Sequence, residues 1–327
     1  MLKEGRAARS SFYTWGGGLA LFLLALIPRA LNLGLFLVPD EPRWMNRSID
    51  FLRAILERDW GATSHAVAPG MATPGGVPTK WAGSVGILIG YLGHRLGFGP
   101  SMDPPPTAGV NIEGFLTWLE ARPQNLLDIL VSVRLPIVLL TSLGVVMVYI
   151  LARKLFNDKV AWLGAALLAL DPFYLAHSRV LHTDALAALF MTLSVLSFIV
   201  YLDAERHPGL FGISLLPWPV LFSGVMSGLA FTTKSGTLFL VPLVASWTIA
   251  TYVLRCRSQG RVHLGQALRL ALILVVWGGM TGLASVLVWP AMWVDPLGTL
   301  QRLFTYSRYL AEAGQTQFFL GRVVSDP

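Results

Sequence analysis

Two adjacent carboxylates, Asp40 and Glu41, directly follow the first long apolar run of the chain. A carboxylate at the boundary between membrane and water stays ionised, and it can act as a general base or as a ligand. The same group inside lipid would cost roughly 2.5 to 3.5 kcal/mol on insertion scales. The pair is therefore a candidate for catalysis, although Asp-Glu-Pro after a helix is also a common beginning of a turn.

Further charged residues lie near the ends of later apolar runs. Arg134 precedes the second run, and Lys234 lies in the turn between the fifth and the sixth. Arg179 and Asp184 lie between the third and fourth runs, after Asp171. Arginine and lysine can bind the phosphate of a lipid-linked donor, while a carboxylate deprotonates an incoming hydroxyl or amine. This chemistry requires that all these residues share one side of the membrane.

The composition indicates an integral membrane protein. Hydrophobic residues make up 54% of the 327 residues and charged residues only 13%, with a mean hydropathy of +0.60. A soluble domain has about 45 to 50% apolar and about 25% charged residues. No stretch shows the alternation of a barrel wall, so the spans are expected to be helices. The sequence predicts an all-α polytopic membrane protein with one domain, residues 1–327.

Apolar runs about as long as a bilayer is thick recur along the chain. The first run is longer than the core of a signal peptide, and no clear cleavage site follows it. We therefore expect an uncleaved first span and a cytoplasmic N-terminus. The seven expected spans are Leu19–Val38, Leu135–Ala152, Val160–Ala176, Ala185–Leu202, Leu215–Phe231, Leu238–Leu254 and Ala267–Trp289.

The segment Ala82–Phe98 decides the topology. It is apolar but short, and it contains His94 and Arg95. If it crossed the membrane, the basic residues of two later loops would lie outside, against the charge bias of short cytoplasmic loops. We therefore expect a helix in the outer leaflet, within a long extracytoplasmic loop over residues 39–133. A small-residue face suited to close helix packing is formed by Gly83, Gly86, Gly90, Gly93 and Gly97.

The long loop is expected to contain helices that lie on the membrane surface and are joined by turns. Residues Trp44–Trp60 have one apolar side, and prolines cluster at 69–78 and 100–106. The last segment, residues 290–327, is also expected at the outer face, with an amphipathic helix over Asp295–Ala313. This helix could cover the site or lead to a further span.

Other classes of function agree less well with the residues. The net charge of +7 comes from short basic clusters between spans rather than from one basic face, so no nucleic-acid partner is expected. The chain has no dinucleotide-binding or phosphate-loop motif. A non-enzymatic transporter stays an alternative, but the span centres are nearly free of charge and show no inverted repeat.

No metal site is assigned from the sequence. His65, His177 and His182 lack the spacing of a helical zinc site. A divalent cation at Asp40 or Glu41 is chemically possible, because carboxylates are its usual ligands. The presence of the carboxylates alone does not decide whether a divalent metal cation or an arginine binds the donor phosphate.

Four segments, taken in order, resemble the protein O-mannosyltransferases and their bacterial relatives, glycosyltransferase family 39, of the GT-C membrane architecture. They are the Asp40-Glu41 pair, Val133-Arg134-Leu135-Pro136, the block from Leu170-Asp171-Pro172 to Arg179 and Asp184, and Gly228 to Gly236 with Lys234. Residues 72–81 depart from the family, because they lack its His-Pro-Pro segment. The chain also ends at Pro327, where relatives continue into further spans, so we expect a truncated chain.

The resemblance implies a GT-C-like helix bundle that transfers a sugar, mannose in the best-known members, from a polyprenyl-phosphate donor. The implied acceptor is a hydroxyl on protein at the extracytoplasmic face. A glycolipid or a cell-wall polymer is the alternative acceptor. The implied setting is the plasma membrane of a prokaryote.

The resemblance also implies roles for individual residues. Asp40 would be the general base or would position the acceptor, with Glu41 supporting it. Candidates for binding the donor phosphate are Arg134, Arg179 and Lys234. Supporting carboxylates would be Asp171 and Asp184, with Asp184 as a possible ion-pair partner of Arg179. Arg134 and Arg179 could instead be anchors at the membrane interface.

Overall fold

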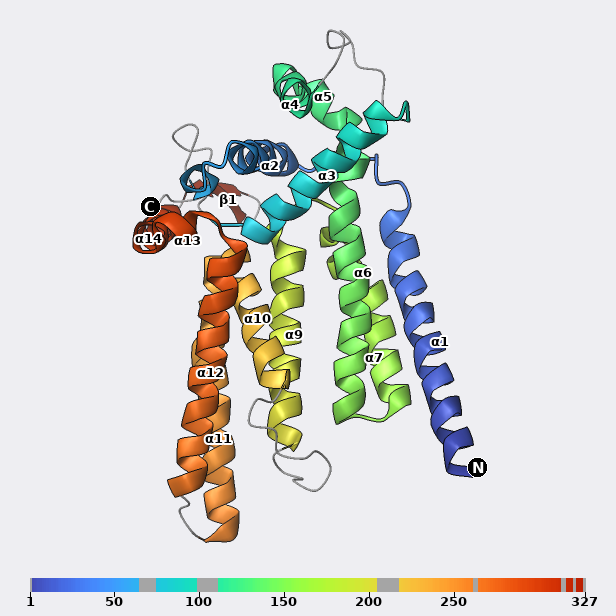
Figure 1. Cartoon of the computed structure of the whole chain (residues 1–327), viewed down its shortest axis with the longest axis vertical. Coiled ribbons are helices and arrows are strands. Elements are labelled where there is room, and N and C mark those ends of the chain that lie inside the picture. The colour runs from blue at the N-terminus through green and yellow to red at the C-terminus, as the bar shows by residue number, and fades with distance from the viewer. Residues whose placement is uncertain are drawn as a thin grey trace.

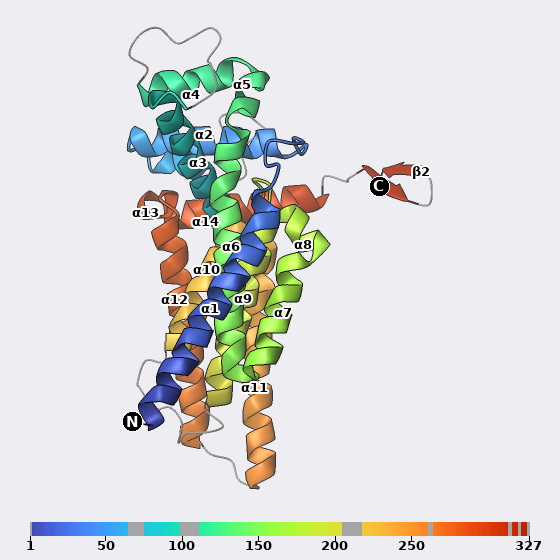
Figure 2. The ribbon, with the colours of Figure 1, turned by 90° about the vertical axis from the view of Figure 1, so that its right-hand side faces the viewer.

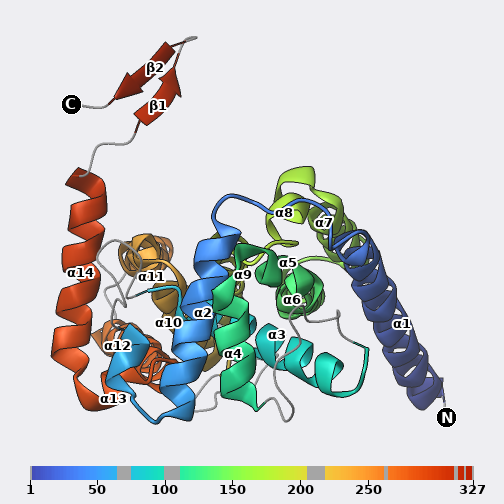
Figure 3. The same cartoon turned by 90° about the horizontal axis from the view of Figure 1, so that it is seen from above.

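The computed structural model describes residues 2–64, 75–98, 111–204, 218–260, 264–312, 316–319 and 322–325. Within these residues the chain is almost entirely helical (Figure 1). The exception is an antiparallel hairpin of β1 (Thr316–Phe319) and β2 (Arg322–Ser325), which lies apart from the helices in Figures 2 and 3. The predicted all-α polytopic class is confirmed, and the hairpin is an addition that the hydropathy pattern did not predict.

Each of the seven expected spans overlaps a helix of the bundle, but the first, Leu19–Val38, was predicted too long, because α1 ends at Ala30 and a loop follows. Among the described residues, α6, α9, the Ser235–Gln259 segment that contains α11, and α12 are long and apolar enough to cross a membrane. The apolar part of α1 covers Gly16–Ala30 and is shorter, as are α7 and α10. The bundle consists of α1 (Leu2–Ala30), α6 (Leu130–Leu155), α7 (Asp158–Leu170), α9 (Thr183–Ala204), α10 (Trp218–Thr233), α11 (Leu240–Gln259) and α12 (Leu264–Val288).

The third expected span, Val160–Ala176, is interrupted, so that prediction was wrong in its extent. Helix α7 ends at Leu170, and a short helix α8 (Pro172–His177) follows. Asp171 has a non-helical backbone, and its Oδ1 accepts a hydrogen bond of 2.7 Å from the Tyr174 N–H. Proline cannot continue a preceding helix, but it suits the first turn of a new one behind an aspartate cap.

The bundle has two ends, because successive long helices run in alternating directions (Figure 1). The first residues of α1 and the last residues of α6 lie at the lower end of Figure 1. The last residues of α1 and the first residues of α6 lie at the upper end, together with the beginning of α9 and with α8, which is labelled in Figure 2. Residues far apart in the sequence therefore meet at the upper end.

Several shorter helices gather at the upper end (Figures 1 and 3). One buried apolar cluster combines residues of these helices with residues of the bundle, including Met45, Leu116, Val133 and Leu186. The expected amphipathic segments at Trp44–Trp60 and Asp295–Ala313 correspond to α2 and α14. The shorter helices are α2 (Glu41–Leu56), η1 (Gly61–Ser64), α3 (Val77–Arg95), α4 (Ile112–Ala121), α5 (Pro123–Asp128), η2 (Ser235–Phe239), α13 (Ala291–Val294) and α14 (Pro296–Glu312).

Helix α3 crosses the upper end obliquely rather than running parallel to the bundle (Figure 1). Part of its glycine face packs closely on neighbours, as predicted. A Cβ at Gly86 would collide with the backbone of α6 at Val133, and one at Gly83 would collide with Ser48 of α2. An added Cβ at Gly93 would meet nothing within 4 Å. The proline clusters at 69–78 and 100–106 lie wholly or partly outside the described residues.

Candidate active site

The structure brings the residues singled out in the sequence to the upper end of the bundle. Asp40 and Glu41 begin α2, and Arg134 lies in the second turn of α6. The remaining four come from the α7–α8 junction, the α8–α9 connection, the first turn of α9 and the α10–η2 junction: Asp171, Arg179, Asp184 and Lys234. The contacts of each residue separate them into different roles.

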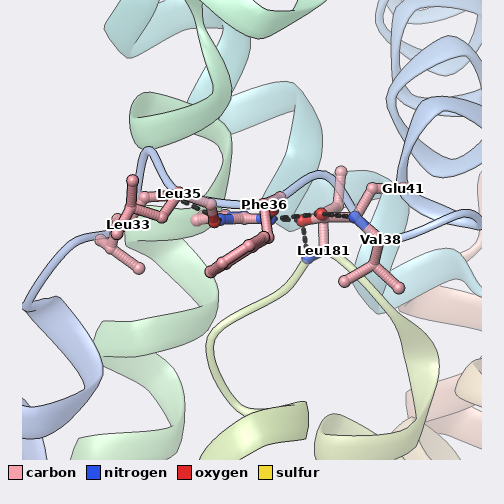
Figure 4. Close-up of polar contacts among 7 residues, drawn as sticks. Leu33, Leu35, Phe36, Val38, Glu41 and Leu181 are labelled. Carbon is pink, nitrogen blue, oxygen red and sulfur yellow. Dashed lines mark hydrogen bonds and ion pairs between the residues drawn. The ribbon is translucent and has the colours of Figure 1, made fainter.

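Glu41 is fully buried, and its carboxylate is fully occupied (Figure 4). Arg134, with 3% of its side chain exposed, donates from Nε to Glu41 Oε1 at 2.8 Å and from Nη2 to Oε2. The backbone N–H of Leu181 donates to Oε1 and that of Val38 donates to Oε2, each at 3.0 Å. Glu41 thus joins α2 to the loop before it, to α6 and to the α8–α9 connection.

The remaining N–H groups of Arg134 hold the loop over residues 31–40. Nη1 donates to the carbonyls of Leu33 and Leu35, and Nη2 donates to the carbonyl of Phe36. With the two bonds to Glu41, all five guanidinium N–H groups of Arg134 are used. Phe36 has a φ of 57°, a left-handed backbone that costs a non-glycine residue about 1 to 3 kcal/mol. Arg134 stabilises this conformation, and we call Glu41 and Arg134 together the clamp.

Asp40 differs from the adjacent Glu41 in both exposure and hydrogen bonding. Its side chain is 54% exposed, and it makes no capping hydrogen bond to α2. Its oxygens lie 3.6 Å from Nη1 of Arg43 and 3.8 Å from Nε2 of His182. Both distances are too long for hydrogen bonds. The Asp40 carboxylate therefore remains accessible to an incoming molecule, on a backbone that the clamp holds in place.

A row of ionisable side chains extends from Asp40 across the upper end. His182 Nδ1 lies 3.4 Å from Asp184 Oδ2, and Lys234 Nζ donates to Asp184 Oδ1 at 2.8 Å. The side chain of Lys234 is 58% exposed, so the ammonium can contact a further anion. We call Asp40, His182, Asp184 and Lys234 the charged row.

His182 was considered in the sequence only as a metal ligand, and its place in the charged row was missed. Burial lowers the pKa of the His182 imidazole, and the nearby Asp184 and Asp40 carboxylates partly oppose this shift. The ring packs edge-on against Trp44, with centroids 6.1 Å apart. Its position two residues before Asp184 was the available signal. At neutral pH the lowered pKa favours the neutral imidazole.

Arg179 contacts the clamped loop rather than Asp184. Its Nη2 donates to the carbonyl of Leu31, whereas the ion partner of Asp184 is Lys234. The expected Arg179–Asp184 pair is therefore replaced, because the chain between α8 and α9 directs Arg179 towards the end of α1. Arg134 and Arg179 thus both bind carbonyls of residues 31–36.

Two of the three arginines of α2, Arg43 and Arg47, add positive charge near Asp40 that was not expected from the sequence. Arg43 is 72% exposed beside Asp40, and the Arg47 guanidinium lies 4.6 Å from the ring of Trp44. Their spacing from Asp40 along a helix could have predicted that these arginines lie near the carboxylate. Among the described residues, no group of three His, Cys, Asp or Glu side chains is placed to hold a metal ion, and His65 lies outside those residues.

An apolar groove of about 600 Å³ lies between α3, α6 and α12. It begins at Pro78, two residues after Gly76, which packs against Trp44 and Thr183 beside the charged row. The indole N–H of Trp81 donates to the Val288 carbonyl at 2.8 Å, which leaves the groove without an unpaired tryptophan N–H. Other lining residues include Val85, Ile89, Leu139 and Leu287.

Comparisons with known proteins agree with this architecture. Residues 126–278 match the family described as dolichyl-phosphate-mannose-protein mannosyltransferase. A relative is the undecaprenyl phosphate-alpha-4-amino-4-deoxy-L-arabinose arabinosyl transferase 1 of Pseudomonas fluorescens (strain Pf-5), 28% identical over 173 residues. The aligned part covers 52% of this chain and 28% of the relative. No solved structure matches.

These matches support the resemblance of this helical membrane protein to glycosyltransferases of the GT-C type. The family match extends from α5 to α12 and includes Arg134, Arg179, Asp184 and Lys234. It begins after Asp40, so the case for that carboxylate rests on the geometry of the site.

Proposed function

We propose that this protein is a glycosyltransferase that moves a sugar from a polyprenyl-phosphate donor to an acceptor hydroxyl at the upper end of the bundle. The observation that carries the proposal is the contrast between two neighbouring carboxylates. Asp40 is exposed and only loosely paired, while buried Glu41 and Arg134 fix the backbone on which it lies. An exposed base on a rigid support suits general-base catalysis.

In the proposed reaction, Asp40 accepts the proton of the acceptor hydroxyl. The acceptor oxygen then bonds to the anomeric carbon of the sugar, and the bond from that carbon to the phosphate oxygen breaks. Its electron pair leaves with the phosphate, and Lys234 and Arg43 are the exposed cations near Asp40 that can stabilise this charge. Asp184 orients Lys234 through their 2.8 Å hydrogen bond.

This proposal changes two of the roles implied by the family resemblance. Arg134 has no N–H group left for a phosphate, and Arg179 binds the Leu31 carbonyl. We assign both arginines, together with Glu41, to positioning the loop that carries Asp40. Asp171 caps α8 and supports the α8–α9 connection.

The isoprenoid chain of the donor would lie in the apolar groove between α3, α6 and α12. The groove begins at Pro78, near the charged row. A phosphate near Lys234 and a tail in the groove would place the donor across the upper end. We expect mannose as the sugar and protein as the acceptor, as in the family that residues 126–278 match. The relative's name instead specifies an aminoarabinose donor.

The test is a transfer assay in membranes that contain the full chain, with labelled polyprenyl-phosphate mannose or polyprenyl-phosphate aminoarabinose. Label in the protein fraction or in the glycolipid fraction identifies the acceptor. We expect Asp40→Asn to lower transfer by about 10² to 10⁴-fold, whereas Glu57→Gln, an exposed carboxylate at the end of α2, should leave it unchanged. Equal rates for Asp40→Asn and the wild type would refute the role of Asp40, and no transfer with either donor would contradict the proposed donors.

A further inference from the structure

We propose that His182 positions the base: its Nε2–H group faces Oδ2 of Asp40 and leaves Oδ1 to accept the proton of the acceptor hydroxyl. The inference rests on the proposed function, in which Asp40 is the general base. Nε2 lies 3.8 Å from Asp40 Oδ2, while Oδ1 lies on the side of Arg43, 3.6 Å from its Nη1. Because His182 acts through Asp40, it is a positioning residue.

The place of His182 in the chain fixes the direction of its ring. His182 immediately precedes α9, and the first backbone N–H groups of a helix have no partner within the helix. One of them, the N–H of Asp184, donates to His182 Nδ1 at 3.4 Å. Trp44 of α2 packs edge-on against the ring, with centroids 6.1 Å apart, and 22% of the His182 side chain is exposed. The ring is therefore held between α2 and α9 with Nε2 towards Asp40.

These contacts assign the tautomer of the ring. A nitrogen that accepts the Asp184 N–H carries no proton, and a neutral imidazole has one N–H group, so the proton lies on Nε2. In the competing arrangement, an Nδ1–H group would donate to Asp184 Oδ2, 3.4 Å away. That proton would then meet the Asp184 N–H head-on. Asp184 has a closer partner in Lys234, which donates to Oδ1 at 2.8 Å.

The ring is uncharged at neutral pH, when the base must be ionised. Burial lowers the pKa of the His182 imidazole. The Asp184 and Asp40 carboxylates oppose this shift, and the neighbouring Lys234 and His177 add to it. A neutral ring with its proton on Nε2 can donate to Asp40, which favours the ionised carboxylate and orients it.

The separation of 3.8 Å is longer than a hydrogen bond, and the Asp40 side chain is the part that can close it. Asp40 is 54% exposed and makes no capping hydrogen bond to α2, whereas the His182 ring is held on two sides. Catalytic hydrogen bonds are often long before the substrate binds, and they shorten in the complex. We therefore expect Asp40 Oδ2 to approach Nε2 when an acceptor hydroxyl binds at Oδ1.

The test compares His182→Phe, which keeps a ring against Trp44 but has no donor, with His182→Gln, whose amide nitrogen can take the place of Nε2. The measurement is the pH profile of kcat/KM in the transfer assay. His182→Phe should lower kcat/KM about tenfold or more. It should also move the acid limb to higher pH, because a carboxylate that loses a donor binds a proton more readily. His182→Gln should stay within about threefold of the wild type, with the acid limb in place. The control His177→Phe replaces another partly buried histidine at the same end and should change neither.

A second measurement needs no transfer activity. In the full chain with ¹⁵N-labelled histidine, the signals that His182→Phe removes belong to His182. We expect the chemical shifts of the neutral Nε2–H form, and Asp40→Asn should move the Nε2 signal whereas Glu57→Gln should not. Equal losses in His182→Phe and His182→Gln, an unmoved acid limb in His182→Phe, or the Nδ1–H tautomer would overturn the proposal. Absence of transfer by the wild type would instead contradict the proposed donors, and the tautomer would then decide the role of His182.

Discussion

Removal of either member of the clamp should destabilise the protein strongly. Arg134→Met would leave the fully buried Glu41 without its ionic partner, and Glu41→Gln would leave Arg134, only 3% exposed, with an uncompensated charge. Breaking a buried ion pair in this way costs about 3 to 5 kcal/mol. We expect this loss in each single variant.

A double variant separates the clamp from an ordinary buried ion pair. Such pairs can often be replaced by apolar residues with little loss of stability. In Glu41→Leu/Arg134→Met, however, backbone groups of the loop would also lose their partners, each at a cost of about 1 to 3 kcal/mol if it stays buried. The affected groups are the carbonyls of Leu33, Leu35 and Phe36 and the N–H groups of Val38 and Leu181. We therefore expect the double variant to remain at least about 3 kcal/mol less stable than the wild type.

The measurement is unfolding in mixed micelles by increasing SDS, followed by circular dichroism. Arg302→Met is the control at the same end, because Arg302 forms a half-exposed ion pair with Asp295 and should lose less than about 1 kcal/mol. Arg134→Lys should also be destabilising, since a lysine keeps the charge but lacks the fork that reaches several carbonyls. A double variant as stable as the wild type would refute the argument that Arg134 organises the loop.

Three further predictions concern the donor site and the helices above it. Lys234→Met should lower kcat/KM for the donor by about 10²-fold and Lys234→Arg by less, measured in the transfer assay; equal effects would exclude a charge role. Burial lowers the pKa of Lys80 in α3 to about 7, from 10.5 in the unfolded chain. Between these pH values the unfolded state binds more protons, so the free energy of unfolding should rise by about 2 to 3 kcal/mol from pH 7 to pH 9. The Lys80→Met variant should lack this rise. If the free energy of unfolding depended on pH in the same way in the variant and the wild type, the assignment to Lys80 would be contradicted. Gly86→Val should lower stability by about 1 to 3 kcal/mol or more through overpacking against α6, whereas Gly93→Val, which meets no atom within 4 Å, should cost much less in the same SDS titration.

The positions of the long helices could be predicted because lipid imposes a length and a composition on each span. Helix α12 (Leu264–Val288) agrees closely with the expected span Ala267–Trp289. The break at Asp171 was also readable, since an aspartate before a proline is a typical cap of a new helix. It was overlooked because the apolar residues on both sides of Asp171 were read as one continuous span. The pairing of β1 with β2 has no counterpart in a hydropathy pattern.

The gathering of charged residues at one end could also be predicted, because alternating spans bring every second loop to the same side. The hydrogen bonds and ion pairs among these charged residues could not be predicted. They depend on the loop over residues 31–40, in which Asn32 and Phe36 adopt positive φ angles without being glycines. Nothing in the residue types of this loop indicates that its backbone adopts this conformation. Once it is formed, its carbonyls attract Arg134 and Arg179, and Lys234 becomes the partner of Asp184.

The different fates of Asp40 and Glu41 follow from helix geometry. Consecutive residues at the start of α2 point about 100° apart, as 3.6 residues per turn requires. One carboxylate can therefore face inward while the other faces water, as Glu41 and Asp40 do. The inward one can stay charged only with a full set of donors, which Arg134 and two backbone N–H groups provide. Because those donors come from α6 and the loops on both sides, the bonds that make burial of Glu41 possible also fix the place of Asp40. An adjacent acidic pair at a membrane boundary is thus expected to combine one structural and one reactive carboxylate, and exchanging the two residues should abolish both roles.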